Sequence, residues 1–226
     1  MKNKIIAIAV FTSLIILAGC EYDNYDEPGS TLSGTVVYNG KAVGVRSGAT
    51  QLELWQYGFA LRSKIPVNIA QDGTFKALVF DGDYKLVRLA GAPWATQTDS
   101  ISVTVAGNTT VEVPVTPFFV ITGESFSYTS SNTTVTGSGL ITKVGTANIN
   151  SATLYVGITN IVDANNNSQS TTISGAALSD LSTPKTLTVV LSAANAARKY
   201  VFVRMGVLSA GSAERYYTPA QKITIQ

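Results

Sequence analysis

The chain has 226 residues, of which 13% are charged, and its formal net charge is +2 at neutral pH. It contains no histidine and a single cysteine, Cys20. Serine–histidine–acid catalysis and zinc sites built from several Cys and His ligands are therefore excluded. Because no pair of acidic residues stands out for glycoside hydrolysis either, the sequence predicts a protein that is not an enzyme and that holds no metal or cofactor.

The first twenty residues have the order of a secretory signal: two lysines, an apolar run at 5–18 and small residues at its end. The apolar run is shorter than the about 20 residues of a membrane-spanning helix. The ending Leu-Ala-Gly-Cys at 17–20 resembles the bacterial lipobox, which implies that a diacylglycerol is attached to Cys20 and that residues 1–19 are removed. An ordinary signal peptide with a chance cysteine is the alternative, and the absence of a second cysteine favours lipidation.

Acyl chains on Cys20 would hold the protein on a membrane, since each buried methylene contributes about 0.8 kcal/mol. The two lysines of the signal, Lys2 and Lys4, would leave with residues 1–19, so that the mature chain has equal numbers of basic and acidic residues. Nucleic-acid binding is disfavoured because no basic excess remains.

Four acidic residues follow the cysteine closely: Glu21, Asp23, Asp26 and Glu27. They resemble the acidic export signal of Bacteroidota lipoproteins, which implies display on the outer face of the outer membrane. A solvated, disordered tether over residues 20–29 is the simpler alternative. The two interpretations are compatible, because an exposed tether can also carry an export signal.

Residues 30–117 are predicted to form a first β-sandwich. Short runs of β-type residues alternate with turn signals and show no helical period, which is typical of an antiparallel sandwich. Asn39-Gly40 is the strongest hairpin signal, and Asp72 and Asp81 each precede a glycine in a turn. The predicted strands are Thr31–Tyr38, Gln51–Tyr57, Ile65–Ala70, Thr74–Phe80, Tyr84–Leu89, Ile101–Val105 and Thr109–Val115.

Four segments of this region carry a likeness to a known domain. They are residues 32–36, residues 52–54, the Asp-Gly-x-Phe turn at 72–75 and the Gly-x-Tyr sequence at 82–84. Together they resemble the carboxypeptidase-regulatory-like domain, a transthyretin-type sandwich of seven strands. The resemblance implies this fold and implies no catalytic activity.

Residues 118–226 are predicted to form a second sandwich, of immunoglobulin or fibronectin type, that folds independently of the first. Pro114 and Pro117 mark the boundary, because proline cannot donate within a β-ladder. Alternating apolar residues at 201–207 predict a central strand, and residues 192–198 predict one helical turn. The predicted strands are Phe118–Thr122, Val135–Thr142, Ala147–Thr159, Ser170–Ser174, Thr186–Leu191, Lys199–Leu208 and Lys222–Ile225.

Two groups of oxygen-bearing side chains are candidates for metal binding, and turns explain both of them better. Asp72, Asp81 and Asp83 are close in sequence, but the first two are turn formers. The Asp-Ala-Asn-Asn-Asn sequence at 163–167 has the alternating ligands of a calcium loop but lacks its sixth-position Gly and twelfth-position Glu. We therefore expect a flexible hairpin loop at this second place.

The order of the parts also resembles a known family: lipobox, acidic tether, carboxypeptidase-regulatory-like sandwich, then a second sandwich. It is similar to a Bacteroidota lipoprotein family of unknown function with paired N- and C-terminal domains, often encoded beside Sus-like glycan-import systems. The resemblance implies an accessory role in surface glycan capture, with a polysaccharide as ligand and Sus-like transporter proteins as partners. It supplies no binding residues.

Aromatic side chains near turns are the candidates for a glycan platform, because a sugar's apolar face stacks on such rings. Trp94 follows Pro93 in a loop-like segment, and loops carry function more often than strands do, although its ring could instead close the end of the sandwich. Trp55 and Tyr57 end the second predicted strand, where a core position is favoured for Trp55. The alternative function is a structural or protein-interaction module that docks on an envelope complex without binding sugar.

Overall fold

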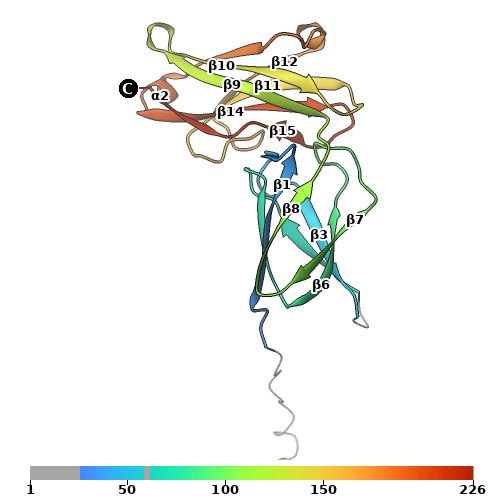
Figure 1. Ribbon diagram of the computed structural model, residues 1–226. Helices are drawn as coiled ribbons and strands as arrows, with labels where there is room; N and C mark the ends of the chain where they lie inside the picture. Colours follow the sequence, from blue (N-terminus) through green and yellow to red (C-terminus); the bar gives the residue numbers. More distant parts are fainter. Residues whose placement is uncertain (1–25, 59–61, 226) are drawn as a thin grey trace, which may run out of the picture.

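The computed structural model describes residues 26–58 and 62–225, and it consists of two β-sandwiches that meet at an angle (Figure 1). The predicted all-β class with two sandwiches is confirmed. Within these described ranges, no helix is long and apolar enough to cross a membrane. The lipobox and the acids Glu21 and Asp23 lie outside the described residues.

The described residues of the first sandwich form eight strands in two facing sheets. One sheet is built from β1 (Ser30–Tyr38), β2 (Lys41–Ala42), β5 (Thr74–Val79) and β8 (Asn108–Pro114). The other has the order β4 (Lys64–Asn68), β3 (Gln51–Gln56), β6 (Gly82–Arg88) and β7 (Ser100–Val105). All the pairings are antiparallel except that of β1 with β8, which is parallel.

The predicted hairpin after Tyr38 is confirmed. Asn39 and Gly40 both have positive φ, at 50° and 71°, and they join Tyr38 directly to its cross-strand partner Lys41. This is the backbone that an Asn-Gly pair favours, because both central residues of a type I′ turn need φ above zero. Strand β2 is only two residues long, which is why the sequence pattern did not predict it.

The second sandwich packs one three-stranded sheet against a five-stranded sheet. The smaller sheet has the order β13 (Lys185–Val190), β10 (Thr134–Lys143) and β9 (Phe119–Thr129). The larger contains β12 (Gln169–Ser174), β11 (Ile149–Gly157), β14 (Tyr200–Ser209), β15 (Arg215–Tyr217) and β16 (Gln221–Thr224). Short helical turns are η2 (Ser130–Asn132), η3 (Gly175–Leu178) and α2 (Ala193–Ala196).

The predicted central strand and helical turn are both confirmed. Strand β14 pairs with β11 on one side and with β15 and β16 on the other. The single turn of α2 is capped by Ser192, whose side chain accepts a hydrogen bond from the Asn195 amide. Ser and Thr are common at this position because they satisfy an amide that has no partner within the helix.

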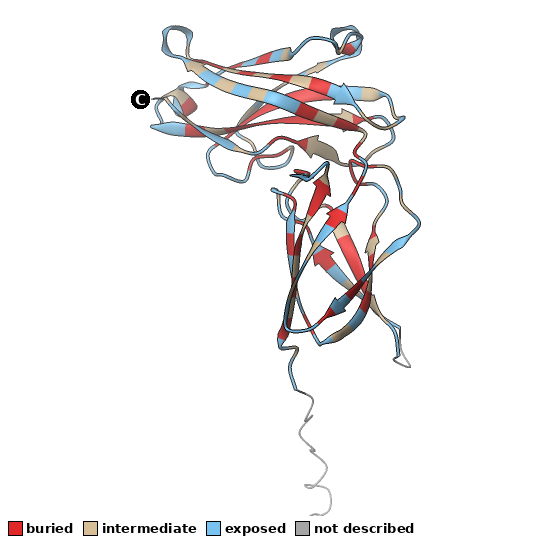
Figure 2. Cartoon of the chain, viewed as in Figure 1, coloured by how far each residue is buried: buried red, intermediate tan, exposed pale blue. Residues whose placement is uncertain are grey.

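Each sandwich has its own apolar core between its two sheets, which Figure 2 shows as stripes of buried residues along the strands. The core of the first sandwich includes fully buried leucines from both sheets: Leu52, Leu54 and Leu86 from one sheet and Leu32 from the other. In the second sandwich, alternate residues of β14 enter the core, and the residues between them face outward, where Arg204 reaches the first sandwich. The outward row of β14 therefore positions the contact between the two sandwiches.

Candidate functional site

The outer face of the sheet β4–β3–β6–β7, here called the outer sheet face, carries an exposed set of aromatic and polar side chains. Because Leu52 and Leu54 point into the core, strand alternation turns Trp55 outward. Trp55 is half-buried and lies opposite Lys64 and Lys85 on the neighbouring strands. The expectation that Trp55 belongs to the core was therefore wrong.

A buried carboxylate supports this tryptophan. The Trp55 Nε1 group donates to Glu53 Oε2 at 3.2 Å, and Lys64 Nζ donates to the other oxygen, Glu53 Oε1, at 2.5 Å. Glu53 is buried on the same outward row of β3. The ring is thus held in one orientation by a hydrogen bond rather than left free to rotate, which lowers the entropy that a ligand would have to offset.

A hollow of about 740 Å³ opens at the end of the sheet; Trp55 does not line it, but Lys85, its cross-strand partner, does. Its lining includes Tyr57, which is 57% exposed, together with Asp83, Lys85, Ser102 and Thr104. Thr104 Oγ1 donates to Asp83 Oδ1 and Lys85 Nζ donates to Ser102 Oγ, each at 2.5 Å. An aromatic ring beside hydroxyl, ammonium and carboxylate groups is a lining that can bind a polar ligand with an apolar face.

The platform predicted at Trp94 is wrong, because its ring is only 2% exposed and belongs to the core of the first sandwich. The backbone of the segment that carries Trp94 is hydrogen-bonded to the linker that leads to the second sandwich. Ala95 N–H donates to Thr116 O at 2.9 Å, and Phe118 N–H donates to Pro93 O at 3.0 Å. The backbone of Trp94 also forms an isolated antiparallel β-bridge with Pro117. The ring closes the end of the sandwich, and its buried Nε1 has no hydrogen-bond partner among the described residues.

The two sandwiches meet around Arg204, which projects from the outward row of β14 and is 1% exposed. Its Nε donates to Thr218 O at 2.6 Å and its Nη2 to Gln71 O at 2.6 Å. Its Nη1 donates to Val45 O at 3.1 Å and to Val162 O at 3.2 Å. One guanidinium therefore satisfies backbone carbonyls of both sandwiches at once.

Arg204 also packs on an aromatic ring, with its guanidinium carbon 4.4 Å from the centroid of Tyr217. Burial lowers the pKa of Arg204 to about 10, so the group is still a cation at neutral pH. Burial likewise raises the pKa of Tyr217, whose phenol accepts a hydrogen bond from Ala164 N–H and stays neutral. A buried cation over a neutral ring is a stabilising arrangement.

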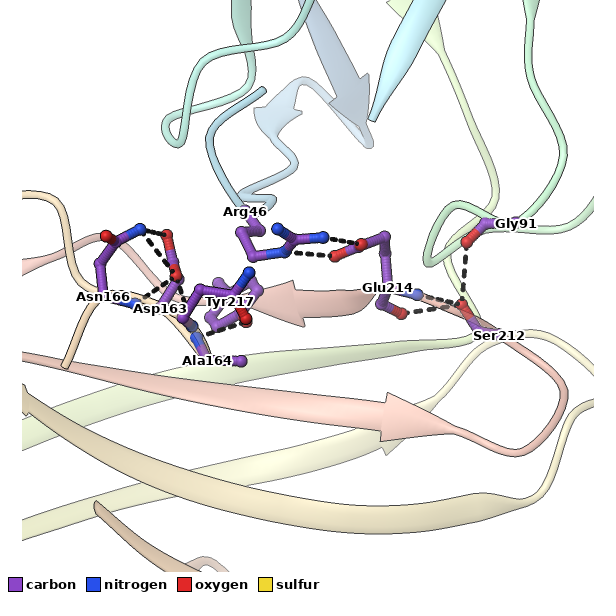
Figure 3. Close-up of polar contacts among 9 residues, drawn as sticks. Arg46, Gly91, Asp163, Ala164, Asn166, Ser212, Glu214 and Tyr217 are labelled. Carbon is purple, nitrogen blue, oxygen red and sulfur yellow. Dashed lines mark hydrogen bonds and ion pairs between the residues drawn. The ribbon is translucent and has the colours of Figure 1, made fainter. Parts of the chain in front are cut away.

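Backbone pairing and ion pairing extend this contact on both sides of Arg204. Tyr217 N–H donates to Gly44 O at 3.0 Å, and a Cβ on Gly44 would lie 2.4 Å from Tyr217 O, so only glycine fits there. At the rim, Arg46 binds both carboxylate oxygens of Glu214, and Ser212 Oγ donates to the Gly91 carbonyl at 3.4 Å (Figure 3). The contact combines a buried centre with a polar rim.

The loop between β11 and β12 is a hairpin loop, as predicted, but it is organised by one acid. Asp163 is fully buried, and its Oδ1 accepts from the amides of Asn165 and Asn166 at 2.8 Å and 2.9 Å (Figure 3). Asn167 Nδ2 in turn donates to the Asp163 carbonyl. The oxygen ligands that resembled a calcium loop are thus used to close the loop on itself.

The turn role predicted for Asp72 is confirmed, whereas Asp81 lies in a bend between β5 and β6 and bonds to residues distant in the sequence instead of to its own turn. Asp72 accepts from the amide and hydroxyl of Thr74, and although burial acts to raise its pKa, these hydrogen bonds leave the pKa lowered. Asp81 accepts from Ser30 Oγ at 2.5 Å and from Gly107 N–H at 2.8 Å, which lowers its pKa. In residues 26–58 and 62–225, no three acidic or other metal-binding side chains come together.

Sequence reasoning missed Arg204, Gln71 and Tyr217 as a connected group. One signal was present: Arg204 is a lone charge between apolar residues of a central strand, which indicates a buried and paired cation. Its partners are mostly backbone carbonyls, which no sequence pattern marks. In the acidic tether, Asp26 and Glu27 are exposed, whereas Cys20, Glu21 and Asp23 fall outside the described residues.

Comparisons with known proteins agree with this architecture. The DUF3823 crystal structure from Bacteroides ovatus is 35% identical, with a TM-score of 0.82 over 87% of this chain and 100% of that one. A second, from Parabacteroides merdae, is 32% identical with a TM-score of 0.80, over 88% and 100%. A Bacteroides uniformis protein described as a "putative carbohydrate binding protein" shares the fold at 15% identity and a TM-score of 0.72, over 87% and 99%. Among curated proteins, the chain has no match.

Two family models cover most of the chain. Residues 30–116 match the N-terminal domain of the protein family of unknown function DUF3823, and residues 119–222 match the domain of unknown function DUF3823_C. The paired N- and C-terminal domains expected from the sequence are therefore present. The chain belongs to the DUF3823 family.

Proposed function

We propose that this protein is a non-catalytic, carbohydrate-binding lipoprotein of the bacterial surface that serves a Sus-like polysaccharide uptake system. The observation that carries the proposal is the outer sheet face, where Tyr57 lines a hollow of about 740 Å³ and the half-buried Trp55 lies on the same face, opposite Lys85 of that lining. Sugars present apolar C–H faces and hydroxyl edges, and this surface offers rings for the first and hydrogen-bonding groups for the second.

The arrangement suits binding better than catalysis. The two carboxylates of the outer sheet face, Glu53 and Asp83, are both engaged, the first with Lys64 and Trp55 and the second with Thr104. Glu53 is thus committed to internal contacts, and the single exposed acid Asp83 does not make up the pair of carboxylates that glycoside hydrolysis uses. The ligand class also agrees with the name of the Bacteroides uniformis protein, whose likeness to this chain extends to the fold alone.

The membrane anchor is part of the same proposal. Lipid on Cys20 and the acids Glu21, Asp23, Asp26 and Glu27 would tether the protein to the outer face of the outer membrane. Strand β1 begins at the end of the first sandwich remote from the second, so a tether there would direct the second sandwich away from the membrane (Figure 1). Ten extended residues reach about 33 Å, enough to lift the first sandwich clear of the headgroups. Recovery of the Cys20→Ser protein with the membranes after a salt wash would contradict the anchor.

Affinity gel electrophoresis against a panel of polysaccharides tests the binding function. Trp55→Ala and Tyr57→Ala are each expected to weaken the retained interaction about tenfold or more, as truncation of an aromatic anchor does. Phe80→Ala is the matched control, because Phe80 is also an exposed ring at this end of the sandwich but follows β5 of the other sheet and so lies off the outer sheet face. Parent protein that no polysaccharide retards, or variants retarded as strongly as the parent, would overturn the proposal.

A second candidate function, a docking module for an envelope complex, is favoured by the contact around Arg204. A protein that spaces or aligns partners has to keep its own domains in a fixed orientation, and hydrogen bonds from Arg204 to both sandwiches serve that purpose. This candidate predicts that the protein co-purifies with a transporter component while no polysaccharide retards it in the gel.

A further inference from the structure

The outward row of β14 has a second half that the first sandwich does not cover. Arg204, near the middle of the strand, is buried by the first sandwich, whereas Tyr200, four residues earlier on the same row, is 40% exposed. The beginning of β14 lies beside α2 and the C-terminal end, away from the first sandwich (Figure 1). The same face of the sheet is thus covered at one end and open at the other.

The open end is hollowed and partly apolar. Ile158, Arg198, Lys199 and Tyr200 line a depression of about 260 Å³ there, and Ile158 is 47% exposed. Ile158 also lines an adjoining depression of about 230 Å³, whose other walls include the amide side chains at 165–167. A single exposed isoleucine therefore separates a cationic hollow from an amide-lined one.

Among the described residues, no ion pair offsets the positive charge at this end. Lys222 Nζ lies 3.8 Å from the centroid of the Tyr200 ring, which brings a third cation next to Arg198 and Lys199. None of the three forms an ion pair; the ion pairs of the described residues join Arg46 to Glu214, Lys64 to Glu53 and Arg88 to Asp99. The neighbouring acid, Asp163, is fully buried and its oxygens accept from groups of its own loop.

A local structural role explains only part of this cluster. Arg198 and Lys199 follow the last turn of α2, where cations complement the partial negative charge of a helix C-terminus. Such a role requires neither Lys222, which comes from β16, nor the exposed surfaces of Tyr200 and Ile158. Three chain segments contribute to one apolar and cationic surface, which a helix terminus alone does not call for.

We propose that this surface is a second binding site, for an acidic polysaccharide whose sugars carry carboxylate or sulfate groups. Arg198, Lys199 and Lys222 would bind the anionic groups, and Tyr200 with Ile158 would contact the sugar rings. Charge-assisted hydrogen bonds are about twice as strong as neutral ones, so a chain with one acid per sugar gains from each cation. The site lies on the second sandwich and does not depend on the outer sheet face.

Gel retardation by polygalacturonate, with a neutral galactan as reference, tests the site. The double variant Lys199→Gln/Lys222→Gln is expected to bind polygalacturonate about tenfold or more weakly and to show a shallower salt dependence. Lys41→Gln/Lys143→Gln is the matched control, because it removes the same charge from exposed positions outside the site. Tyr200→Ala should weaken binding without changing its salt dependence.

Several results would overturn the inference. These are a parent protein that neither polygalacturonate nor a sulfated polysaccharide retards, and equal losses in the test and control pairs, which would indicate non-specific charge. Binding to phosphatidylglycerol vesicles but not to the polymers would indicate a lipid surface instead. Trp55→Ala keeps the two proposals apart: if it abolishes polygalacturonate binding while Lys199→Gln/Lys222→Gln does not, the acidic polymer binds at the outer sheet face and the second site is wrong.

Discussion

Two regions of the first sandwich each contain one of the protein's two tryptophans, and they differ in how their polar groups are satisfied. At the end that meets the second sandwich, Trp94 is in the core, and the nearby carbonyls of Val45 and Gln71 accept from Arg204. On the outer sheet face, Trp55 lies among side chains that reach solvent.

The difference separates a structural region from the region that we propose for binding. At the junction, the Arg204 guanidinium and the carbonyls it binds are buried and paired within the chain, and the unpaired Trp94 Nε1 is itself buried, so neither is open to a ligand. On the outer sheet face, Tyr57 and the groups around it pair only in part and remain accessible, so they can exchange water for a ligand at little cost. Similar residue types therefore have different roles, and burial decides which.

The largest expected effect compares the two tryptophans directly. Trp94→Ala should lower the free energy of unfolding by about 3–5 kcal/mol, because it leaves a cavity in the core, whereas Trp55→Ala should cost no more than about 1 kcal/mol. Chemical denaturation measures both. Trp94→Phe serves as a control with a smaller loss, because the indole N–H it removes has no partner. Equal losses for the two alanine variants would mean that Trp55 is part of the fold rather than of a binding surface.

The next effect concerns the centre of the junction. Arg204→Met should destabilise the protein by about 2–4 kcal/mol, since four carbonyls lose their donor and each buried unpaired group costs about 1–3 kcal/mol, partly offset by the removal of a buried charge. We also expect the parent to unfold in one transition because Arg204 bonds to both sandwiches, and this transition to broaden or split in Arg204→Met. Arg198→Met, at an exposed position, should change stability by less than about 0.5 kcal/mol. An unchanged transition in Arg204→Met would show that the junction does not couple the sandwiches.

Much of the fold follows from the sequence because strands and turns have local causes. The Asn39-Gly40 hairpin and the turn at Asp72 depend on residues within a few positions of one another, and the apolar alternation that predicts β14 is equally local. Strand β15, at Arg215–Tyr217, was not predicted because three residues are too few to show alternation.

The site residues were harder to predict because burial is decided far away in the chain. Gly91-Ala-Pro-Trp94 has the composition of a loop, yet its neighbour in space is the linker at Thr116–Phe118, which turns a loop tryptophan into a core residue. Trp55 was predictable in principle: once Leu52 and Leu54 are assigned to the core, alternation sends Trp55 outward. The partners of Arg204 include the backbone carbonyl of Val45, which is distant in the sequence. Every residue has a backbone carbonyl, so the sequence cannot indicate which ones bind Arg204.

The smallest expected effect is at the rim of the junction. Arg46 and Glu214 form a bidentate ion pair there, and both side chains are partly exposed. The Glu214 hydrogen bond raises the pKa of Arg46, which shows the attraction, but water competes for both groups. We therefore expect Arg46→Gln to cost about 1 kcal/mol or less, and a double-mutant cycle with Glu214→Gln to give a coupling energy of similar size that shrinks in 1 M salt. A coupling above about 2 kcal/mol that salt leaves unchanged would place the rim pair on a level with the buried centre. The contact between the sandwiches would then depend on ion pairing at its rim as much as at its centre. In that case the junction and the outer sheet face would differ only in how exposed their polar groups are, and no longer in how strongly those groups are paired.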